Sequence, residues 1–351
     1  MSIWNSETYR ADIRGGAAQL DTEQLRGKRI LITGATGLIC SAIVDLLIHS
    51  NREDGANIVI YAAGRSKSKI EARFPHGKDF GLVPVVYDAT RAVDFDFAVD
   101  YIIHGASNAS PDKYVSEPVD TLTANVFGMA NLLDYARKAG AKKTVYVSSS
   151  EVYGKLAHGR PLVEDEYGDV DILAVRSAYA MGKRAAETLC IGYHSQYGTD
   201  VSIVRPGHIY GPTAQNSDNR VSSAFVRQAV AGENIVMKSA GTQLRSYCHC
   251  IDCATATLAV LTRGAGGQAY NISNKNAVIT IRQMSEIIAR FAGVELIMDM
   301  PKDAEKAAFN PMDNSSLSSE KLESLGWNGC FDAPLGFSHT IAVLKELQAQ
   351  Q

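Results

Sequence analysis

The sequence predicts an α/β protein built on a Rossmann-type doubly wound parallel sheet, and three observations support this. Between residues 29 and 204, short runs rich in β-branched residues alternate with longer segments whose apolar residues recur every three or four positions. The short runs are apolar throughout, as in strands covered on both faces. A glycine-rich turn, Gly34-Ala35-Thr36-Gly37, follows the first run and opens the first helical segment.

The elements follow in an order typical of such a sheet. Strands are expected at residues 29–33, 57–62, 82–87, 101–105, 144–148 and 201–204. Long helices are expected between them at residues 38–50, 118–139 and 179–197. Beyond Arg205 the pattern loosens into a helix at 221–231, a strand, helix and strand across 245–270, and short helices and loops. Because ligands of open α/β sheets bind at the carboxyl edge of the strands, we expect this later part to pack there.

This pattern divides the chain into three parts. Residues 1–28 are expected to form an N-terminal extension. Residues 29–205 and 246–273 are expected to form the Rossmann domain that binds NAD(P). Residues 206–245 and 274–351 are expected to form a smaller, discontinuous α/β domain that binds the substrate.

Composition narrows the class of protein. The 35 basic and 38 acidic side chains nearly balance, so net charge gives no reason to expect nucleic acid or a membrane surface as a partner. No apolar stretch resembles a signal peptide or a membrane span, and six scattered cysteines are typical of reduced thiols, so we expect a cytoplasmic protein. Cys248, His249, Cys250 and Cys253 lack the paired spacing of zinc ligands, and no metal site is expected.

The glycine-rich turn is the first candidate binding element. A turn without Cβ atoms lets backbone N–H groups and the positive end of a helix approach a pyrophosphate. The alternative is an ordinary glycine turn between a strand and a helix, and the position of the loop in a βαβ unit favours the binding role. The expected contacts to the dinucleotide come from Gly34, Thr36, Gly37, Leu38 and Ile39, with Cys40 where a third glycine is common.

The end of the second strand bears on which cofactor is used. An acidic residue there would bind the ribose of NAD, but the chain has Arg65 followed by Ser66, which suit a 2′-phosphate and favour NADP over NAD. Alternatively, Arg65 is solvated or stacks on the adenine of either cofactor. Asp88 is expected either to accept from the adenine amine or to cap a turn, and Ala106 follows the fourth strand beside the cofactor.

A second candidate element supplies catalytic groups. Tyr179 and Lys183 are four residues apart and therefore lie on one helix face. An ammonium beside a phenol lowers its pKa from about 10 and makes it a better base. Upstream, Ser149 and Glu151 follow a predicted strand and place a hydroxyl and a carboxylate at the carboxyl edge of the sheet.

With these motifs in this order, the chain resembles the extended short-chain dehydrogenase/reductases, in the NAD-dependent epimerase/dehydratase group that modifies nucleotide sugars. The local match is closest to UDP-glucuronate decarboxylases. Their S-E-V-Y-G pattern is present from Ser150 to Gly154, and their R-x-x-Y-x-x-G-K-R-x-A-E helix runs from Arg176 to Glu187. The run 219–225 resembles the segment that covers the nucleotide in these enzymes.

The resemblance implies hydride transfer at C4 of a UDP- or dTDP-linked pyranose through a 4-keto sugar. Tyr179 would take the C4 hydroxyl proton, and Lys183 would lower the pKa of Tyr179 and hold the nicotinamide ribose. Ser149 would hydrogen-bond the C4 oxygen. Glu151 would act as a second acid or base near C5.

The resemblance also implies substrate contacts, and several reactions stay open. Arg245 and Arg220 would bind the diphosphate, His208 stands where these enzymes carry an asparagine, and Arg176 would bind a substrate carboxylate or pair with a neighbouring acid. Ser150 occupies the aspartate position of 4,6-dehydratases, which disfavours dehydration. The sequence leaves four functions open: a 4-epimerase, a decarboxylase, an NADPH-dependent 4-ketoreductase and a non-catalytic NAD(P)-binding sensor.

The resemblance further predicts a homodimer. In this family the helices expected at 118–139 and 179–197 form a four-helix interface between subunits. The alternative is that both helices are buried within one subunit.

Overall fold

A parallel sheet of seven strands forms the centre of the protein. In the computed structural model, which describes residues 2–107, 109, 111–156, 159–299 and 314–350, every pairing in this sheet is parallel, and the strand order is β10-β6-β5-β4-β1-β2-β3. The strands are β1 (Arg29–Thr33), β2 (Val59–Gly64), β3 (Leu82–Val86), β4 (Tyr101–His104), β5 (Lys143–Val147), β6 (Val201–Pro206) and β10 (Ala269–Ile272). The order reverses between β1 and β4, which confirms the predicted doubly wound sheet.

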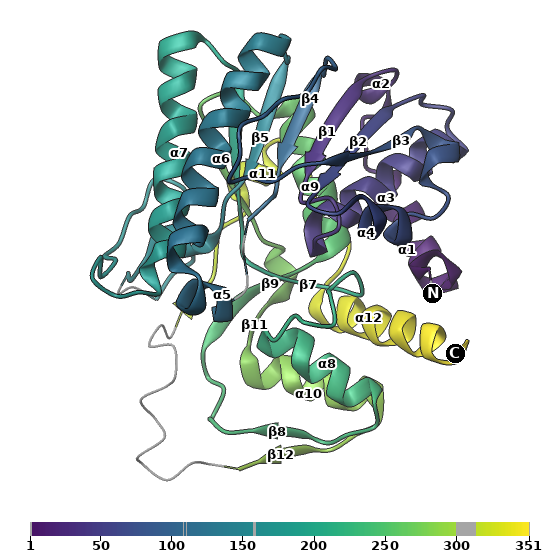
Figure 1. The fold of residues 1–351 in the computed structure, drawn as a ribbon. Helices are drawn as coiled ribbons and strands as arrows, with labels where there is room; N and C mark the ends of the chain where they lie inside the picture. The colour runs from purple at the N-terminus through teal and green to yellow at the C-terminus, as the bar shows by residue number, and fades with distance from the viewer. Residues whose placement is uncertain (1, 108, 110, 157–158, 300–313, 351) are drawn as a thin grey trace.

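Helices cover both faces of this sheet (Figure 1). Alternate residues of β1 face opposite ways: Ile30 and Ile32 join a core with α3 (Leu38–Glu53) and α9 (Cys250–Arg263), whereas Leu31 packs toward α6 (Pro118–Ala139). Helix α7 (Ser177–Tyr197) packs along α6 on that second face. Because helices cover both faces, the strands are mostly apolar, as the sequence pattern predicted.

The N-terminal extension is helical and packs against the α3 and α9 side. It comprises a 3₁₀ turn, η1 (Ile3–Asn5), and two helices, α1 (Glu7–Ala17) and α2 (Thr22–Leu25). Tyr9 and Ile13 of α1 are fully buried in the core that α3 and α9 share. The segment is therefore part of the packed structure.

Short helices connect the strands of the large sheet. Helix α4 (Lys67–Arg73) follows β2, η2 (Gly77–Phe80) precedes β3, α5 (Pro111–Ser116) precedes α6, and η3 (Ser150–Tyr153) follows β5. Helix α5 and turn η3 both lie at the carboxyl ends of their strands. They bring side chains to the edge where the candidate site forms.

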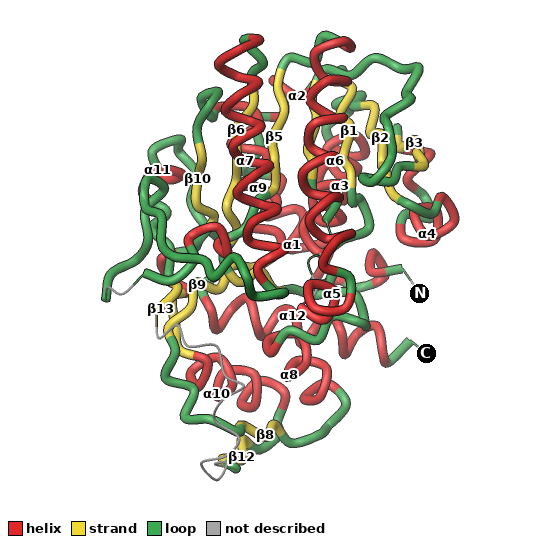
Figure 2. Tube along the Cα trace, turned by 60° about the vertical axis from the view of Figure 1, so that its left-hand side comes forward, coloured by secondary structure: helices red, strands yellow, loops and turns green. Residues whose placement is uncertain are grey.

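The second part of the chain lies beyond one end of the large sheet (Figures 1 and 2). Its main sheet contains β7 (His208–Tyr210), β9 (Leu244–His249), β11 (Val278–Thr280) and β13 (Asn314–Ser315), and a second pair joins β8 (Ile235–Met237) to β12 (Leu296–Met298). Its helices are α8 (Val221–Val230), α10 (Ile281–Ala292) and α12 (Ala333–Gln348); the turns η4 (Lys275–Ala277) and α11 (Glu320–Glu323) flank β10. Strand β9, most of which the domain division assigned to the Rossmann part, pairs in this smaller sheet.

Two contacts bring this second part to the start of α3. The Thr213 hydroxyl donates to the Leu38 carbonyl at 2.8 Å, and the Gln215 amide donates to the Thr36 carbonyl at 3.2 Å. Strand β7 begins directly after β6 ends, so the second part lies at the carboxyl ends of the large sheet's strands. Within the described residues, no helix is both long and apolar enough to cross a membrane.

Candidate active site

The turn after β1 has the geometry that a dinucleotide needs. Gly34 has a φ of 70°, and a Cβ there would lie 2.8 Å from the Gly105 carbonyl oxygen, so only glycine fits without strain. Gly37 is the N-cap of α3 and offers no side-chain oxygen to the N–H groups of the first turn. The predicted binding residues Thr36, Leu38 and Ile39 occupy this same turn, where the helix end favours a pyrophosphate.

Close packing beside the turn comes from Gly105 instead of a third glycine in the motif. A Cβ on Gly105 would lie 2.3 Å from the Cys40 sulfur. The Cys40 side chain therefore fills the space that Gly105 leaves open. Ala106, expected beside the cofactor, follows directly, and its N–H donates to the Thr33 hydroxyl at 3.3 Å.

The segment after β2 presents a cation at the same edge. Arg65 is exposed and lies close enough to Asp88 to lower its pKa. Asp88 accepts hydrogen bonds from the backbone and the hydroxyl of Thr90, at 3.0 and 2.8 Å, and these bonds are the main cause of its lowered pKa. Asp88 therefore caps the turn, which was one of the two roles expected for it.

Ser149, Tyr179 and Lys183 come together at the carboxyl end of β5. The Tyr179 hydroxyl is hydrogen-bonded to the side chains of Ser149 and Tyr114. The Lys183 ammonium lies 5.7 Å from the centre of the Tyr179 ring and donates to the Val147 carbonyl at 2.8 Å. Tyr179 is 6% exposed and Lys183 is 2% exposed, so both are shielded from water.

Burial sets the protonation of this pair. It is the largest influence on the Tyr179 phenol and raises its pKa, against the hydrogen bonds from Ser149 and Tyr114 and the charge of Arg220, which lower it. Burial also lowers the pKa of Lys183 to about 7, and the carboxylate of Glu187 opposes that change. The charge on the lysine is therefore sensitive to pH near neutrality.

A buried ion pair holds this stretch of α7 against the sheet. The Glu187 carboxylate, one turn beyond Lys183, accepts from Arg205 of β6 at 3.0 and 2.7 Å. Arg205 also donates to the Tyr153 hydroxyl at 3.1 Å, which ties the turn η3 to the same network. Ser149 is the N-cap of η3, and its hydroxyl accepts a hydrogen bond from the Glu151 N–H at 3.2 Å. Because the network holds η3 in place, it also holds Ser149.

Glu151 faces Arg176 at the site. Their side chains lie 3.4 Å apart and are 42% and 53% exposed, so this is a weak, solvated pair. Of the two roles weighed for Arg176, the structure contains the pairing with an acid. Ser150 opens η3 beside Glu151 and is partly exposed.

The three residues expected to hold the substrate diphosphate lie near one another. Burial first, and then the charges of Arg245 and Arg220, lower the pKa of His208 to about 3, so its imidazole is neutral at pH 7. Arg220 binds the Asp218 carboxylate at 2.5 and 2.9 Å, and its charge also reaches Tyr179. Arg220 therefore lies near the phenol of Tyr179.

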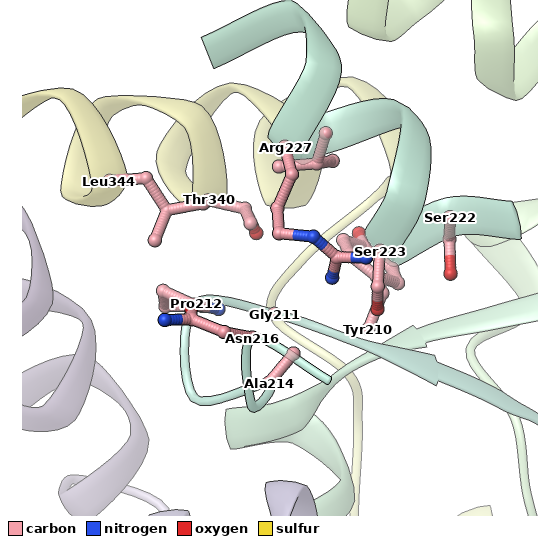
Figure 3. A pocket seen from close by; sticks show the side chains of 11 residues that line it. Tyr210, Gly211, Pro212, Ala214, Asn216, Ser222, Ser223, Arg227, Thr340 and Leu344 are labelled. Carbon is pink, nitrogen blue, oxygen red and sulfur yellow. The ribbon is translucent and has the colours of Figure 1, made fainter. Parts of the chain in front are cut away.

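Two other features lie outside this arrangement. A small hollow forms between α8, α12 and the loop after β7, and Arg227 reaches from α8 toward the loop that holds Pro212 and Asn216 (Figure 3). None of the proposed catalytic residues lines this hollow. Cys248, His249, Cys250 and Cys253 are all buried, and the described part of the chain has no group of three side chains placed to bind a metal.

Sequence reasoning missed two residues that contact this site. The ring of Tyr114 in α5 stacks on that of Tyr179, and Asp218 holds Arg220. Asp218 could have been noticed as an acid two residues before Arg220, which was expected to bind the diphosphate. Tyr114 carries no sequence signal of its own, because α5 is too short to show periodicity.

The fold and this site together define a short-chain dehydrogenase/reductase of the extended type. The chain belongs to the NAD dependent epimerase/dehydratase family, whose model matches residues 30–273, and it is an enzyme of that family. UDP-glucuronic acid decarboxylase 6 of Arabidopsis thaliana is 34% identical over 303 residues, covering 85% of this chain and 83% of the plant protein. UDP-glucuronic acid decarboxylase 1 of Xenopus tropicalis is 30% identical and covers 92% and 74% respectively.

Solved structures agree on the fold. A dTDP-glucose 4,6-dehydratase from Streptomyces venezuelae with bound NAD is 24% identical, with a TM-score of 0.77, covering 92% of this chain and 98% of that one. A UDP-N-acetylglucosamine 4-epimerase from Methanobrevibacter ruminantium is 22% identical, with a TM-score of 0.77, covering 93% and 100%. At these identities the likeness establishes the fold and leaves the substrate open.

Proposed function

We propose that the protein transfers hydride at C4 of a UDP- or dTDP-linked pyranose through a 4-keto sugar, in the manner of the epimerases and decarboxylases. The observation that carries the proposal is the hydrogen bond between Ser149 and Tyr179, with Lys183 on the same helix face. Such a group can remove a hydroxyl proton and hold the resulting oxygen. A pure NAD(P) sensor would need no base there.

The cofactor fits the turn after β1. Gly34, Thr36, Gly37, Leu38 and Ile39 would hold the pyrophosphate at the start of α3. When bound, the nicotinamide supplies the group that accepts or returns the C4 hydride. The Val147 carbonyl accepts a hydrogen bond from the Lys183 ammonium and fixes its position. From there the ammonium would hold the nicotinamide ribose.

The protein's own groups handle the proton at O4. As the phenolate, Tyr179 would accept this proton when the sugar is oxidised, and the resulting phenol would return it when the 4-keto group is reduced. Ser149 donates a hydrogen bond to the same oxygen and stabilises the charge that develops on it. Burial of Tyr179 keeps bulk water away from this transfer.

The nucleotide end of the substrate would lie toward Arg220 and Arg245. Their charges act on one neighbourhood around His208, where a diphosphate would be neutralised. Because His208 stays neutral, it can donate a hydrogen bond without adding charge. With these two guanidinium groups at the site, a chain with a net charge of −3 would still be able to bind an anionic substrate.

Glu151 would provide the second acid or base, near C5. Its partner Arg176 is half exposed, so a substrate carboxylate can compete for the guanidinium at little cost. This supports a uronate substrate and agrees with the curated decarboxylase relatives. A second candidate, an NADPH-dependent 4-ketoreductase of a dTDP-4-keto-6-deoxy sugar, is favoured by Arg65 at the end of β2.

The proposal includes a cytoplasmic homodimer formed through α6 and α7. Large apolar side chains are exposed on both helices. They include Val119 (69% exposed), Leu122 (38%) and Phe127 (56%) on α6, and Ile191 (43%) on α7. Burying such residues against a second copy would stabilise the pair.

The test is incubation with a panel of UDP- and dTDP-sugars, with and without NADPH, followed by product mass. Loss of carbon dioxide identifies a decarboxylase, an unchanged mass with a changed sugar an epimerase, and a gain of two hydrogens a reductase. Tyr179→Phe is expected to abolish turnover and keep cofactor binding. Turnover that survives this substitution would overturn the proposed role of the phenol.

A further inference from the structure

A buried carboxylate lies in the middle of α3, the helix that begins at the cofactor turn. Asp45 is two helical turns after Leu38 and is fully buried. A carboxylate in this position is tolerated only when donors surround it. Its donors come from two segments that are remote in the sequence.

The N-terminal segment supplies the first two donors. The Trp4 indole N–H donates to one carboxylate oxygen at 2.8 Å, and the Tyr9 hydroxyl donates to the other at 2.6 Å. Both residues precede residue 30, where the family match begins. Tyr9 is fully buried, and burial together with Asp45 raises its pKa, so it stays a hydrogen-bond donor.

Helix α4 supplies the other donor. Arg73, its last residue, forms an ion pair with Asp45 through one guanidinium nitrogen and a longer contact of 3.4 Å through another. Burial disfavours the Arg73 cation, but the charges and hydrogen bonds of Asp45 and Tyr9 together outweigh this and raise the pKa of Arg73. Helix α4 begins directly after Arg65 and Ser66, the turn expected to contact the adenosine ribose.

We propose that Asp45 is a positioning residue for the cofactor, joining the helix of the pyrophosphate turn to the helix of the ribose turn, with Trp4 and Tyr9 as the clasp that holds it. The proposal rests on NAD(P) binding, which is part of the proposed function. The N-terminal segment thereby contributes to cofactor affinity without touching the cofactor. The same segment should have little effect on the affinity of the protein for the nucleotide part of the sugar substrate.

Tyr9→Phe tests this clasp, because it removes one donor and keeps the buried ring. We expect the dissociation constant for the cofactor that the wild type binds, NADP⁺ or NAD⁺, to rise about threefold to tenfold by isothermal titration. The dissociation constant for UDP or dTDP, whichever the wild type binds, should change less than about twofold. Trp4→Phe removes the other donor from a less buried position and keeps the test open if Tyr9→Phe does not fold.

Thr8→Val is the matched control. Thr8 neighbours Tyr9 on α1, but its hydroxyl donates to Glu346 of α12, whereas the Tyr9 hydroxyl donates to Asp45. It should lower the melting temperature without changing cofactor affinity.

The outcomes separate three cases. A selective loss of cofactor affinity in the clasp variants supports the proposal. Equal melting losses in Tyr9→Phe and Thr8→Val, with unchanged cofactor affinity in both, would mean that the clasp is only structural and would overturn it. A wild type that binds neither NAD⁺ nor NADP⁺ would instead refute the proposed function itself.

Discussion

The rings of Tyr114 and Tyr179 lie nearly parallel, with centroids 4.2 Å apart and an interplanar angle of 11°. Tyr114 is 6% exposed, and its one hydroxyl proton can be donated either to the Ala109 carbonyl, 2.9 Å away, or to Tyr179. The phenol of Tyr179, the proposed base, is thus covered by a second phenol from α5. The side chain that shields Tyr179 therefore also sets its hydrogen bonding.

Tyr114→Phe should keep the stacking and remove one hydrogen bond to Tyr179. Since this hydrogen bond lowers the pKa of Tyr179, its loss raises that pKa. We expect kcat/KM to fall about twofold to tenfold, the range for one hydrogen bond. The acidic limb of the pH profile should move to higher pH. Tyr135→Phe removes a hydrogen bond to the Phe97 carbonyl away from this site and should leave the profile unchanged; a matching shift there would contradict the assignment.

Lys183→Met should stabilise the apoprotein at neutral pH while abolishing turnover. The folded pKa of Lys183 is about 7 and its ordinary value is 10.5, so between these values the unfolded chain binds more protons. Stability of the wild type therefore rises with pH across this window, and the cost of burying the charge is largest below about pH 7. The melting temperature of the variant should exceed the wild type by about 2 °C or more at pH 7 and converge with it near pH 10.

Lys69→Met is the control for this titration, because Lys69 is exposed on α4. Because an exposed side chain contributes little to stability, the melting temperature of this variant should stay within about 1 °C of the wild type at both pH 7 and pH 10. If Lys183→Met destabilised the protein equally at pH 7 and pH 10, the lysine would not be carrying a buried charge in the fold.

Arg65→Ala should separate the two cofactors. A guanidinium bound to a 2′-phosphate makes charge-assisted hydrogen bonds, whose loss weakens binding about 10-fold to 100-fold. We expect that loss for NADP⁺ and a change below about twofold for NAD⁺, measured by titration calorimetry. An equal loss for both cofactors would indicate that Arg65 stacks on the adenine instead.

The sequence predicts those features whose cause is local. The bounds of α6 are as expected, because proline at its start and glycine after its end are local signals. Tyr179 and Lys183 share a face because their spacing alone determines it. Each expected strand also forms, with ends that shift by up to two residues.

The missed features depend on contacts between distant segments. Ser6 caps α1, and Tyr9 and Ile13 share its buried face. The position of the helix, however, depends on contacts with α3, α9 and α12. The ion pair between Asp45 and Arg73 joins two helices whose approach the sheet determines. No periodicity in either segment specifies such a pairing.

Phe127→Glu should convert the proposed homodimer to a monomer. Phe127 is 56% exposed on α6, and a buried carboxylate without a partner would be costly in an apolar interface. Light scattering at micromolar concentration should fall from the mass of two subunits to that of one, 37.8 kDa. Val86→Glu, on a residue 63% exposed on β3 at the far edge of the sheet, should leave the mass unchanged. A wild type that already scatters as one subunit would show that the apolar side chains of α6 and α7 do not join two copies.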